Sequence, residues 1–314
     1  MNPEYLPMNS AEVLDRVFET YKRSFGKQLL YSLIVGAIGF GVMFIFAIFG
    51  SLMLVFAFFA YNASFIVGGG IILSFLLLLL LFWSAASSTG HLLLSKPAFY
   101  GRHVALPPGE LGKTILRVVS AIIAQLLLSI PFIIIIILLL YFLFSTVFLS
   151  PVLDMFMVDP VLSVITFVGT FAIISLFGGF LYIVYTNFFF LVVSVAVFEK
   201  RIFFGTLKRS WELIRGDFWK ILGIRVLWFI IIAVITNSAA GILLISDWLI
   251  STFAAGVNIE LIYFGIASLV NMLSLGIAFI VAPLRGIMPA VIYFNQRIKK
   301  EGMGIEIQIE RLWP

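Results

Sequence analysis

Long apolar runs without charge alternate with short charged blocks along the whole chain. A membrane-spanning helix needs about 20 consecutive apolar residues, and the runs are long enough to form six such helices. Several runs exceed that length, so we expect those helices to tilt, break or project beyond the bilayer. The six spans are predicted near residues 29–60, 65–90, 118–149, 161–198, 219–245 and 261–297.

The same pattern predicts how the rest of the chain is organised. We expect an all-α, polytopic transmembrane helical bundle over residues 28–298. An amphipathic helix over 1–27 precedes it, and a polar tail over 299–314 follows it. Interfacial segments at 96–117 and 199–218 connect spans on one side of the membrane.

A short motif recurs where three of the spans begin. It reads FGKQLL at 25–30, LGKTIL at 111–116 and FWKILG at 218–223, with Lys27, Lys113 and Lys220 at its centre. Each copy opens a two-span hairpin, so the bundle is predicted to contain three hairpins. The motif leaves two interpretations open: a pseudo-threefold internal repeat, or three membrane entry points that resemble one another.

The basic residues predict the orientation of the spans. Four segments, residues 1–27, 96–117, 199–225 and 297–314, hold nineteen of the twenty Lys and Arg residues. The connections on the other side hold none. Because basic connecting segments stay in the cytoplasm, we expect a multi-pass protein of the cell membrane with both termini in the cytoplasm.

Two cytoplasmic segments have the pattern of helices that lie at the membrane surface. One covers residues 9–25. In the other, an apolar stripe from Phe204 to Phe218 includes Trp211 and faces away from the charged side chains. Such helices either bind anionic lipid headgroups or a protein partner, or serve only as an anchoring collar. The residues predicted to contact lipid or the interface are Lys27, Lys113, Lys208, Arg209, Trp211, Arg215 and Lys220.

The composition excludes a soluble domain and several kinds of binding and catalytic chemistry. Of the 314 residues, 62% are apolar or aromatic and 11% are charged, whereas about a quarter of a soluble domain is charged. The net charge of +5 does not indicate nucleic-acid binding, because the charges flank spans rather than forming one basic surface. The chain has no cysteine, which excludes disulfides, thiolate nucleophiles and cysteine-ligated metals.

Candidate catalytic groups are few. The two histidines, His91 and His103, have no carboxylate close in sequence and form no metal-binding motif. We therefore expect them to be partly solvated residues near the interface, and we predict no catalytic residue, metal or cofactor. The charged residues of the predicted outer connections are all acidic. This pattern indicates either a negative outer mouth or simple complementarity to the basic inner side. These residues are Asp154, Asp159, Asp247 and Glu260.

Arg285 is a charge well inside a predicted span, in the sequence VAPLRGIMPA. Pro283 and Pro289 on either side each remove a backbone donor, so the helix is expected to kink or open there. A guanidinium in the hydrocarbon needs a partner, and we expect Arg285 to point into the bundle. Asn187, Asn271, free backbone carbonyls or a bound anion such as a lipid phosphate are the candidate partners. The arginine thus either ties the helix to its neighbours or contacts a ligand.

Three segments resemble a known family. They are LDRVFETYKRSFGKQLL at 14–30, LKRSWELIRGDFWKILG at 207–223 and PAVIYFNQRIKKEGMGIEI at 289–307. They are similar to the glycerophosphoryl diester phosphodiesterase membrane domain and to related six-span proteins of bacteria and archaea. Asn295 stands where that family usually has Asp. The catalytic barrel sometimes fused to this domain needs about 250 residues, and the predicted spans take up most of this chain. The resemblance therefore implies the membrane module and not the phosphodiesterase.

Three functions are compatible with these features. The favoured hypothesis is a non-enzymatic membrane protein that assists transport, envelope maintenance or a membrane complex through contact with anionic lipid or a protein partner. The alternative is a small transporter or exporter, including a protein that protects against cationic peptides, with a pathway between the hairpins. An enzyme acting on lipid phosphates is least favoured, because the acid and base residues it would need are scarce.

Overall fold

The computed structural model describes residues 6–60, 63–105, 109–147, 169, 178–253 and 259–302. Every regular element in these residues is a helix, which confirms the all-α prediction. In lipid a helix satisfies its own backbone hydrogen bonds, which is why apolar runs of this length become helices. The labelled helices are α1 (Ser10–Ala60), α2 (Ala63–Phe99), α3 (Glu110–Val147), α6 (Val192–Phe198), α7 (Phe203–Ile214), α8 (Phe218–Phe253) and α9 (Ile259–Glu301). Residues 178–188 are also helical.

Six helical stretches in the described residues are long and apolar enough to cross a membrane. The chain is therefore a multi-pass membrane protein, and the prediction of six spans is confirmed. The stretches are Ser10–Leu52, Ser74–Phe99, Glu110–Pro131, Gly178–Phe198, Phe218–Ser238 and Asn271–Glu301.

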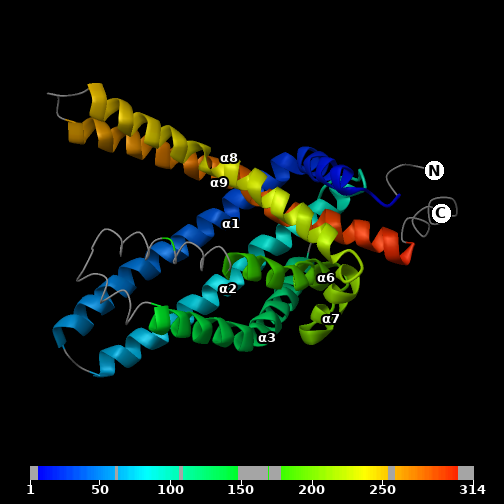
Figure 1. The fold of residues 1–314 in the computed structure, drawn as a ribbon, viewed down its shortest axis with the longest axis horizontal. Helices are drawn as coiled ribbons and strands as arrows, with labels where there is room; N and C mark the ends of the chain where they lie inside the picture. Colours follow the sequence, from blue (N-terminus) through cyan, green and yellow to red (C-terminus); the bar gives the residue numbers. More distant parts are fainter. Residues whose placement is uncertain are drawn as a thin grey trace.

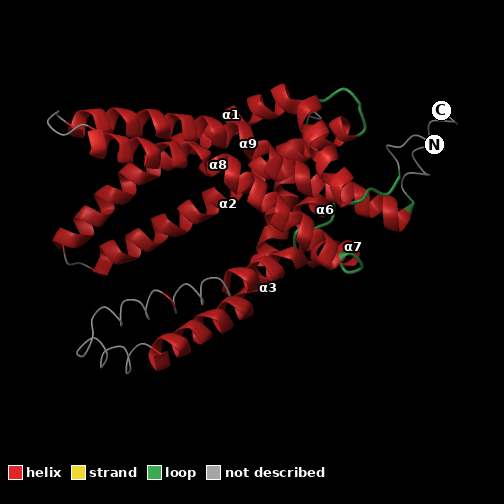
Figure 2. Cartoon of the chain, turned by 45° about the horizontal axis from the view of Figure 1, so that its top comes forward, coloured by secondary structure: helices red, strands yellow, loops and turns green. Residues whose placement is uncertain are grey.

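The long helices converge at one end of the molecule and diverge toward the other (Figure 1). We call the convergent end, where α1, α3 and α8 begin and α2 and α9 finish, the base, and the opposite ends the tips. The helices α1 and α2 form one antiparallel hairpin, α8 and α9 form another, and α3 packs against α6 and α7. The turned view in Figure 2 shows the same separation of the hairpins toward the tips.

The buried core lies at the base. Phe294 of α9 contacts Phe99 of α2 and Phe198 of α6, with ring centroids 4.9 and 4.8 Å apart. Farther toward the tips, large apolar side chains such as Phe40 and Phe229 are exposed. In a membrane these side chains face lipid, which is as apolar as they are. The base thus holds the hairpins together.

Glycines allow the helices to approach closely near the base. A methyl group on Gly90 would lie 1.9 Å from the Tyr31 ring, and one on Gly36 would lie 2.3 Å from Phe279. The first contact joins α1 with α2 and the second joins α1 with α9. Small residues serve this purpose in many membrane bundles.

Two helices continue where the sequence suggested a break. Helix α9 runs through Pro283 and Pro289 as one helix, so the expected opening at Arg285 does not interrupt it. Helix α1 runs from Ser10 into its membrane segment as one helix, without a boundary near Lys27. Within the described residues, a break does occur at a turn over residues 189–191, just before α6.

Candidate functional site

A polar cavity lies where α9 meets the α1–α2 hairpin. Its volume is about 460 Å³. Helix α1 contributes one hydroxyl, α2 contributes three hydroxyls and an imidazole, and α9 contributes a guanidinium. The polar lining residues are Ser32, Ser84, Ser87, Ser88, His91 and Arg285.

Small residues of α9 leave the room for this cavity. Ala278, Ala282 and Gly286 recur every four residues and therefore line one face of the helix. A methyl group on Gly286 would lie 2.6 Å from Cβ of His91, so α9 touches α2 at that point. The cavity is thus bounded by a tight helix contact on the side toward the base.

The sequence predicted that His91 is partly solvated near the interface, and this prediction is wrong, because the residue is held within the protein. It is buried, and its Nδ1 lies 2.5 Å from Oε1 of Gln28. An amide oxygen only accepts, so Nδ1 carries the proton and Nε2 is free to accept from the Ser32 hydroxyl, 3.4 Å away. Gln28 in turn donates to the backbone oxygen of His91 at 3.1 Å. Both ring nitrogens therefore have partners.

The Arg285 side chain faces the cavity and is exposed. It forms no hydrogen bond or ion pair with the residues that the structure describes. Its neighbour Gly286 packs on His91, which bonds Gln28, the residue after the charged Lys27. Arg285 therefore lies beside the first uncharged turn of α1.

The two asparagines proposed as partners of Arg285 lie elsewhere. Asn271 is exposed on α9, more than three turns before Arg285. Asn187 is fully buried, and it accepts a hydrogen bond from Nη1 of Arg225 at 3.1 Å. Its amide nitrogen donates to the backbone oxygen of Phe218 at 3.2 Å. The prediction that Asn187 pairs with Arg285 is therefore wrong.

Arg225 is a second charge inside a span, and the sequence analysis missed it. Besides Asn187, it contacts the Thr186 hydroxyl at 3.3 Å and lies 4.4 Å from the centre of the Phe190 ring. We had counted Arg225 with the basic connecting segment. The apolar residues on both sides of it, in GIRVLW, are the signal that could have separated it from that segment. The protein thus supplies partners to one intramembrane arginine and leaves the other open to the cavity.

Four residues from segments 207–223 and 289–307 meet at the base, together with Glu199. Arg209 of α7 donates to both carboxylate oxygens of Glu199 at 3.0 Å and pairs with Glu301 of α9. Arg297 pairs with Glu301 at 2.7 Å, and the Tyr293 hydroxyl donates to Glu199 at 3.1 Å. Burial alone would lower the pKa of Arg209, but the hydrogen bonds and negative charges of Glu199 and Glu301 raise it above its ordinary value. We call these five residues the base network.

Other contacts tie the ends of the chain to the same region. Asn295 accepts a hydrogen bond from the backbone nitrogen of Met8 at 2.8 Å and donates to its oxygen at 3.3 Å. Lys299 pairs with Asp217 at 2.6 Å. Lys300 donates to the backbone oxygens of Glu212 and Leu213 at the end of α7. These contacts position α7 and the N-terminal segment on α9.

The predicted interfacial residues fall into two groups. Arg209 faces protein carboxylates, with 18% of its side chain exposed, and the Lys27 ammonium donates to the backbone oxygen of Val104. Lys27 is nevertheless exposed, and so are Lys113, Lys208, Arg215 and Lys220.

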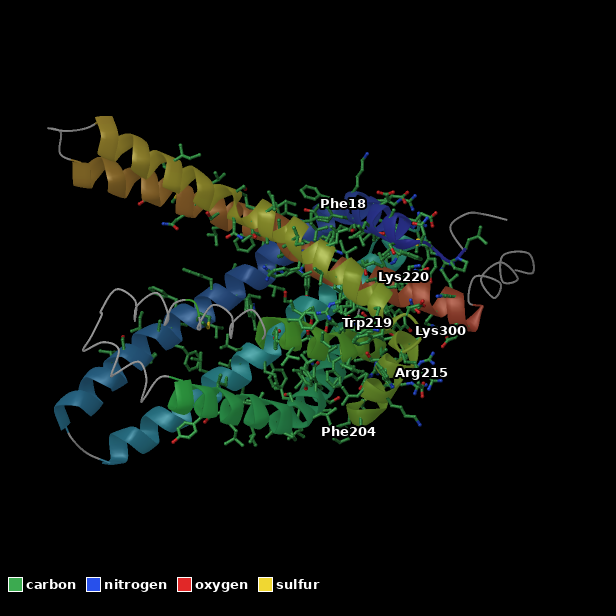
Figure 3. The ribbon with its side chains drawn as sticks, in the orientation of Figure 1. Phe18, Phe204, Arg215, Trp219, Lys220 and Lys300 are labelled. Carbon is green, nitrogen blue, oxygen red and sulfur yellow. The ribbon has the colours of Figure 1, made fainter. Side chains whose placement is uncertain are left out.

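Trp211 of α7 is 39% exposed and packs on Phe188, with ring centroids 5.0 Å apart. Figure 3 shows Phe204, Arg215, Trp219, Lys220 and Lys300 around the base. Lys113 and Lys220 lie in the first turns of α3 and α8, whereas Lys27 lies well inside α1.

The proposed acidic outer mouth lies outside what the structure describes. Asp154 and Asp159 fall between the described residues. Asp247 and Glu260 belong to α8 and α9, near the tips, but their side chains are not among those described. Within the described residues, no group of three or more potential metal ligands occurs.

Comparison with known proteins gives no relative for this chain. No family model matches it, no curated protein matches it, and no solved structure matches it. The site must therefore be interpreted from its own geometry.

Proposed function

We propose that this chain is a non-enzymatic protein of the cell membrane that binds an anionic lipid headgroup in the polar cavity. Through that binding it would assist transport, envelope maintenance or a membrane complex. The observation that carries the proposal is the guanidinium of Arg285, which has no partner among the described residues, in a hydroxyl-lined cavity. The proposal also takes the base, with both termini, to be on the cytoplasmic side.

A bound anion explains why an arginine is tolerated at this position. A charged side chain within a span costs at least about 2.5 kcal/mol unless it is paired or hydrated. Arg225 avoids that cost through Asn187 and Thr186, whereas Arg285 has no such partner in the described residues. The planar guanidinium matches a phosphate with two parallel hydrogen bonds, and the serine hydroxyls can donate further ones.

The charge at the base supports the orientation. Lys208, Arg215 and Lys220 are exposed there, together with the large apolar side chains of Phe204 and Trp219 (Figure 3). Basic residues beside exposed aromatic ones are typical of the cytoplasmic membrane surface, where anionic lipids attract them. These side chains would hold the base against the headgroups while Arg285 takes a headgroup from the same leaflet.

The family resemblance remains part of the proposal. The segments that resemble the family contribute Arg209, Tyr293, Arg297 and Glu301 to the base network, and these residues do not line the polar cavity. They therefore support a shared membrane module rather than a shared reaction centre. An enzyme is less well supported than a binding protein, because both nitrogens of His91 are occupied and the cavity lining has no carboxylate.

A small exporter is the second candidate. The polar cavity lies between α9 and the α1–α2 hairpin, and the two hairpins diverge from there toward the tips (Figure 2). An exporter would release an amphiphile bound at Arg285 between these hairpins. Transport of a fluorescent anionic lipid across proteoliposomes would favour this candidate over simple binding.

Removal of the Arg285 charge tests the binding function. Arg285→Gln should reduce retention of anionic phospholipid by the purified protein about tenfold, because charge-assisted hydrogen bonds to phosphate are lost. Native mass spectrometry in the presence of phosphatidylglycerol and phosphatidylcholine measures that retention. Arg102→Gln is the matched control, since it removes one exposed arginine charge outside the cavity and outside the residues predicted to contact lipid. Equal anionic-lipid retention by both variants would contradict the proposal.

A further inference from the structure

Beside the polar cavity lies a second hollow of opposite character. It has a volume of about 330 Å³ and is lined by apolar side chains of α1 and α2, with Ile115 of α3 at its edge. The one polar side-chain atom of its walls, the indole nitrogen of Trp83, already donates to the backbone oxygen of Val35 at 2.9 Å. We call this hollow the apolar groove.

The two hollows adjoin each other at Val35 and Trp83, which line both. Along α1 the polar cavity involves residues 32–36, and the apolar groove continues from Val35 to Met43. Along α2 the polar cavity involves residues 83–91, and the groove continues back to Leu76. The order from base to tips is therefore a cation and hydroxyls first, then hydrocarbon.

Beyond the groove toward the tips, the two helices are in contact again. Phe46 of α1 and Phe75 of α2 meet there with ring centroids 5.8 Å apart. The stretch of α1 between Val35 and Met43 covers about 12 Å at the helical rise of 1.5 Å per residue. The Trp83 ring lies against Gly39, where a methyl group would be 2.1 Å from the indole nitrogen. This close contact places the indole where the two hollows adjoin.

We propose that the apolar groove holds an acyl chain of the lipid whose phosphate binds Arg285. The inference rests on the proposed function and adds the ligand class: a long-chain anionic phospholipid rather than a free anion or a headgroup alone. A lipid of the cytoplasmic leaflet has its phosphate at the surface and its chains toward the midplane, the same order as the two hollows. Chain contacts with the groove walls are individually weak dispersion contacts that sum over the chain.

Filling the groove tests this inference. Leu80→Trp inserts an indole into the groove at a residue that does not line the polar cavity. We expect the long-chain form of phosphatidylglycerol to bind this variant about tenfold more weakly, a loss of ~1.4 kcal/mol. A short-chain form should bind the variant and the wild type equally. Native mass spectrometry with both lipids measures the difference.

Matched variants separate folding defects from filling of the groove. Leu77→Trp adds the same indole to the same helix at an exposed residue outside the groove, and it should keep the preference for long chains. Met43→Trp fills the groove from α1 and should repeat the effect of Leu80→Trp. If one of the two variants folds poorly, the other still tests the inference.

Unchanged long-chain preference in folded Leu80→Trp and Met43→Trp would overturn the acyl-chain inference. In that case, a loss of anionic lipid in Arg285→Gln would still support headgroup binding. Conversely, reduced long-chain binding in the groove variants with full anionic selectivity in Arg285→Gln would contradict the proposed function, and with it the link between the groove and Arg285.

Discussion

Nη1 of Arg225 donates a hydrogen bond to the amide oxygen of Asn187, 3.1 Å away and on a different helix. The amide nitrogen of Asn187 then donates to the backbone oxygen of Phe218, the first residue of α8. One asparagine thus joins the charge of a span to the start of the same helix. This contact attaches the segment before α6 to α8.

Removal of the Asn187 amide should destabilise the protein. Asn187→Ala leaves Arg225 with fewer partners inside the membrane, and loss of a hydrogen bond to a charged group costs about 1.5–3 kcal/mol. Thermal unfolding in detergent should show a lower midpoint. Asn271→Ala, an exposed asparagine in another span, is the control and should leave the midpoint nearly unchanged. Equal midpoints for the two variants would mean that the Arg225 contact does not stabilise the fold.

Arg209 should matter more for stability than its neighbour Lys208. Arg209→Gln leaves Glu199 and Glu301 without their shared partner, and we expect a loss of about 1–3 kcal/mol. Lys208→Gln removes an equal charge from an exposed residue and should change stability by less than about 0.5 kcal/mol. Denaturation followed by tryptophan fluorescence compares the two, and similar losses would argue that the base network is not a stabilising unit.

Acid should weaken the attachment of α9 to the start of α8. Burial alone would raise the pKa of Asp217, but its hydrogen bond and ion pair with Lys299 hold that pKa below the ordinary value of 3.8. A depressed folded-state pKa means that the stabilisation is complete above the unfolded pKa and is lost as the pH falls through the folded value. The contribution of Asp217 is therefore expected to disappear below about pH 4.

The comparison of pH profiles isolates this carboxylate. The unfolding midpoint of Asp217→Asn should fall less between neutral pH and pH 3 than that of the wild type. Glu110→Gln serves as the control, because Glu110 and Lys200 form an exposed pair 3.6 Å apart, and such pairs contribute little. Parallel profiles for wild type and Asp217→Asn would show that the Lys299 contact does not contribute.

Thiol labelling tests the proposed orientation without background, since the chain has no cysteine. Asp154→Cys and Asp247→Cys should react with an impermeant maleimide added to intact cells, because both lie in or near predicted outer connections. Lys208→Cys, at the base, should react after the cells are opened. Reaction of position 208 in intact cells, with silence at position 154, would reverse the orientation.

The sequence by itself determined the class of the protein and its spans. Hydrophobicity and length decide whether a segment leaves water, and a helix is how a single segment satisfies its backbone in lipid. Both properties are local, so the six spans could be counted without knowledge of any contact. Local hydrophobicity also identified Arg285 as a charge inside an apolar span. It did not separate Arg225 from the connecting segment before it.

Only the tertiary structure decided which polar groups meet. The sequence offered Asn187 as a candidate partner of Arg285, but helix packing placed it beside Arg225.

On α7 the sequence predicted an apolar stripe at the membrane surface that includes Phe204 and Trp211. Both side chains are exposed, and the structure shows in addition that the buried face of the helix includes Thr206 and Ser210. Small side chains fit against neighbouring helices, while large aromatic ones can remain at the lipid surface.

The polar cavity and the apolar groove also arise from distant segments, which bring residues 32–43, 76–91 and 275–286 together. Such contacts depend on helix separation and side-chain volume between segments, and no local pattern in the sequence records either quantity.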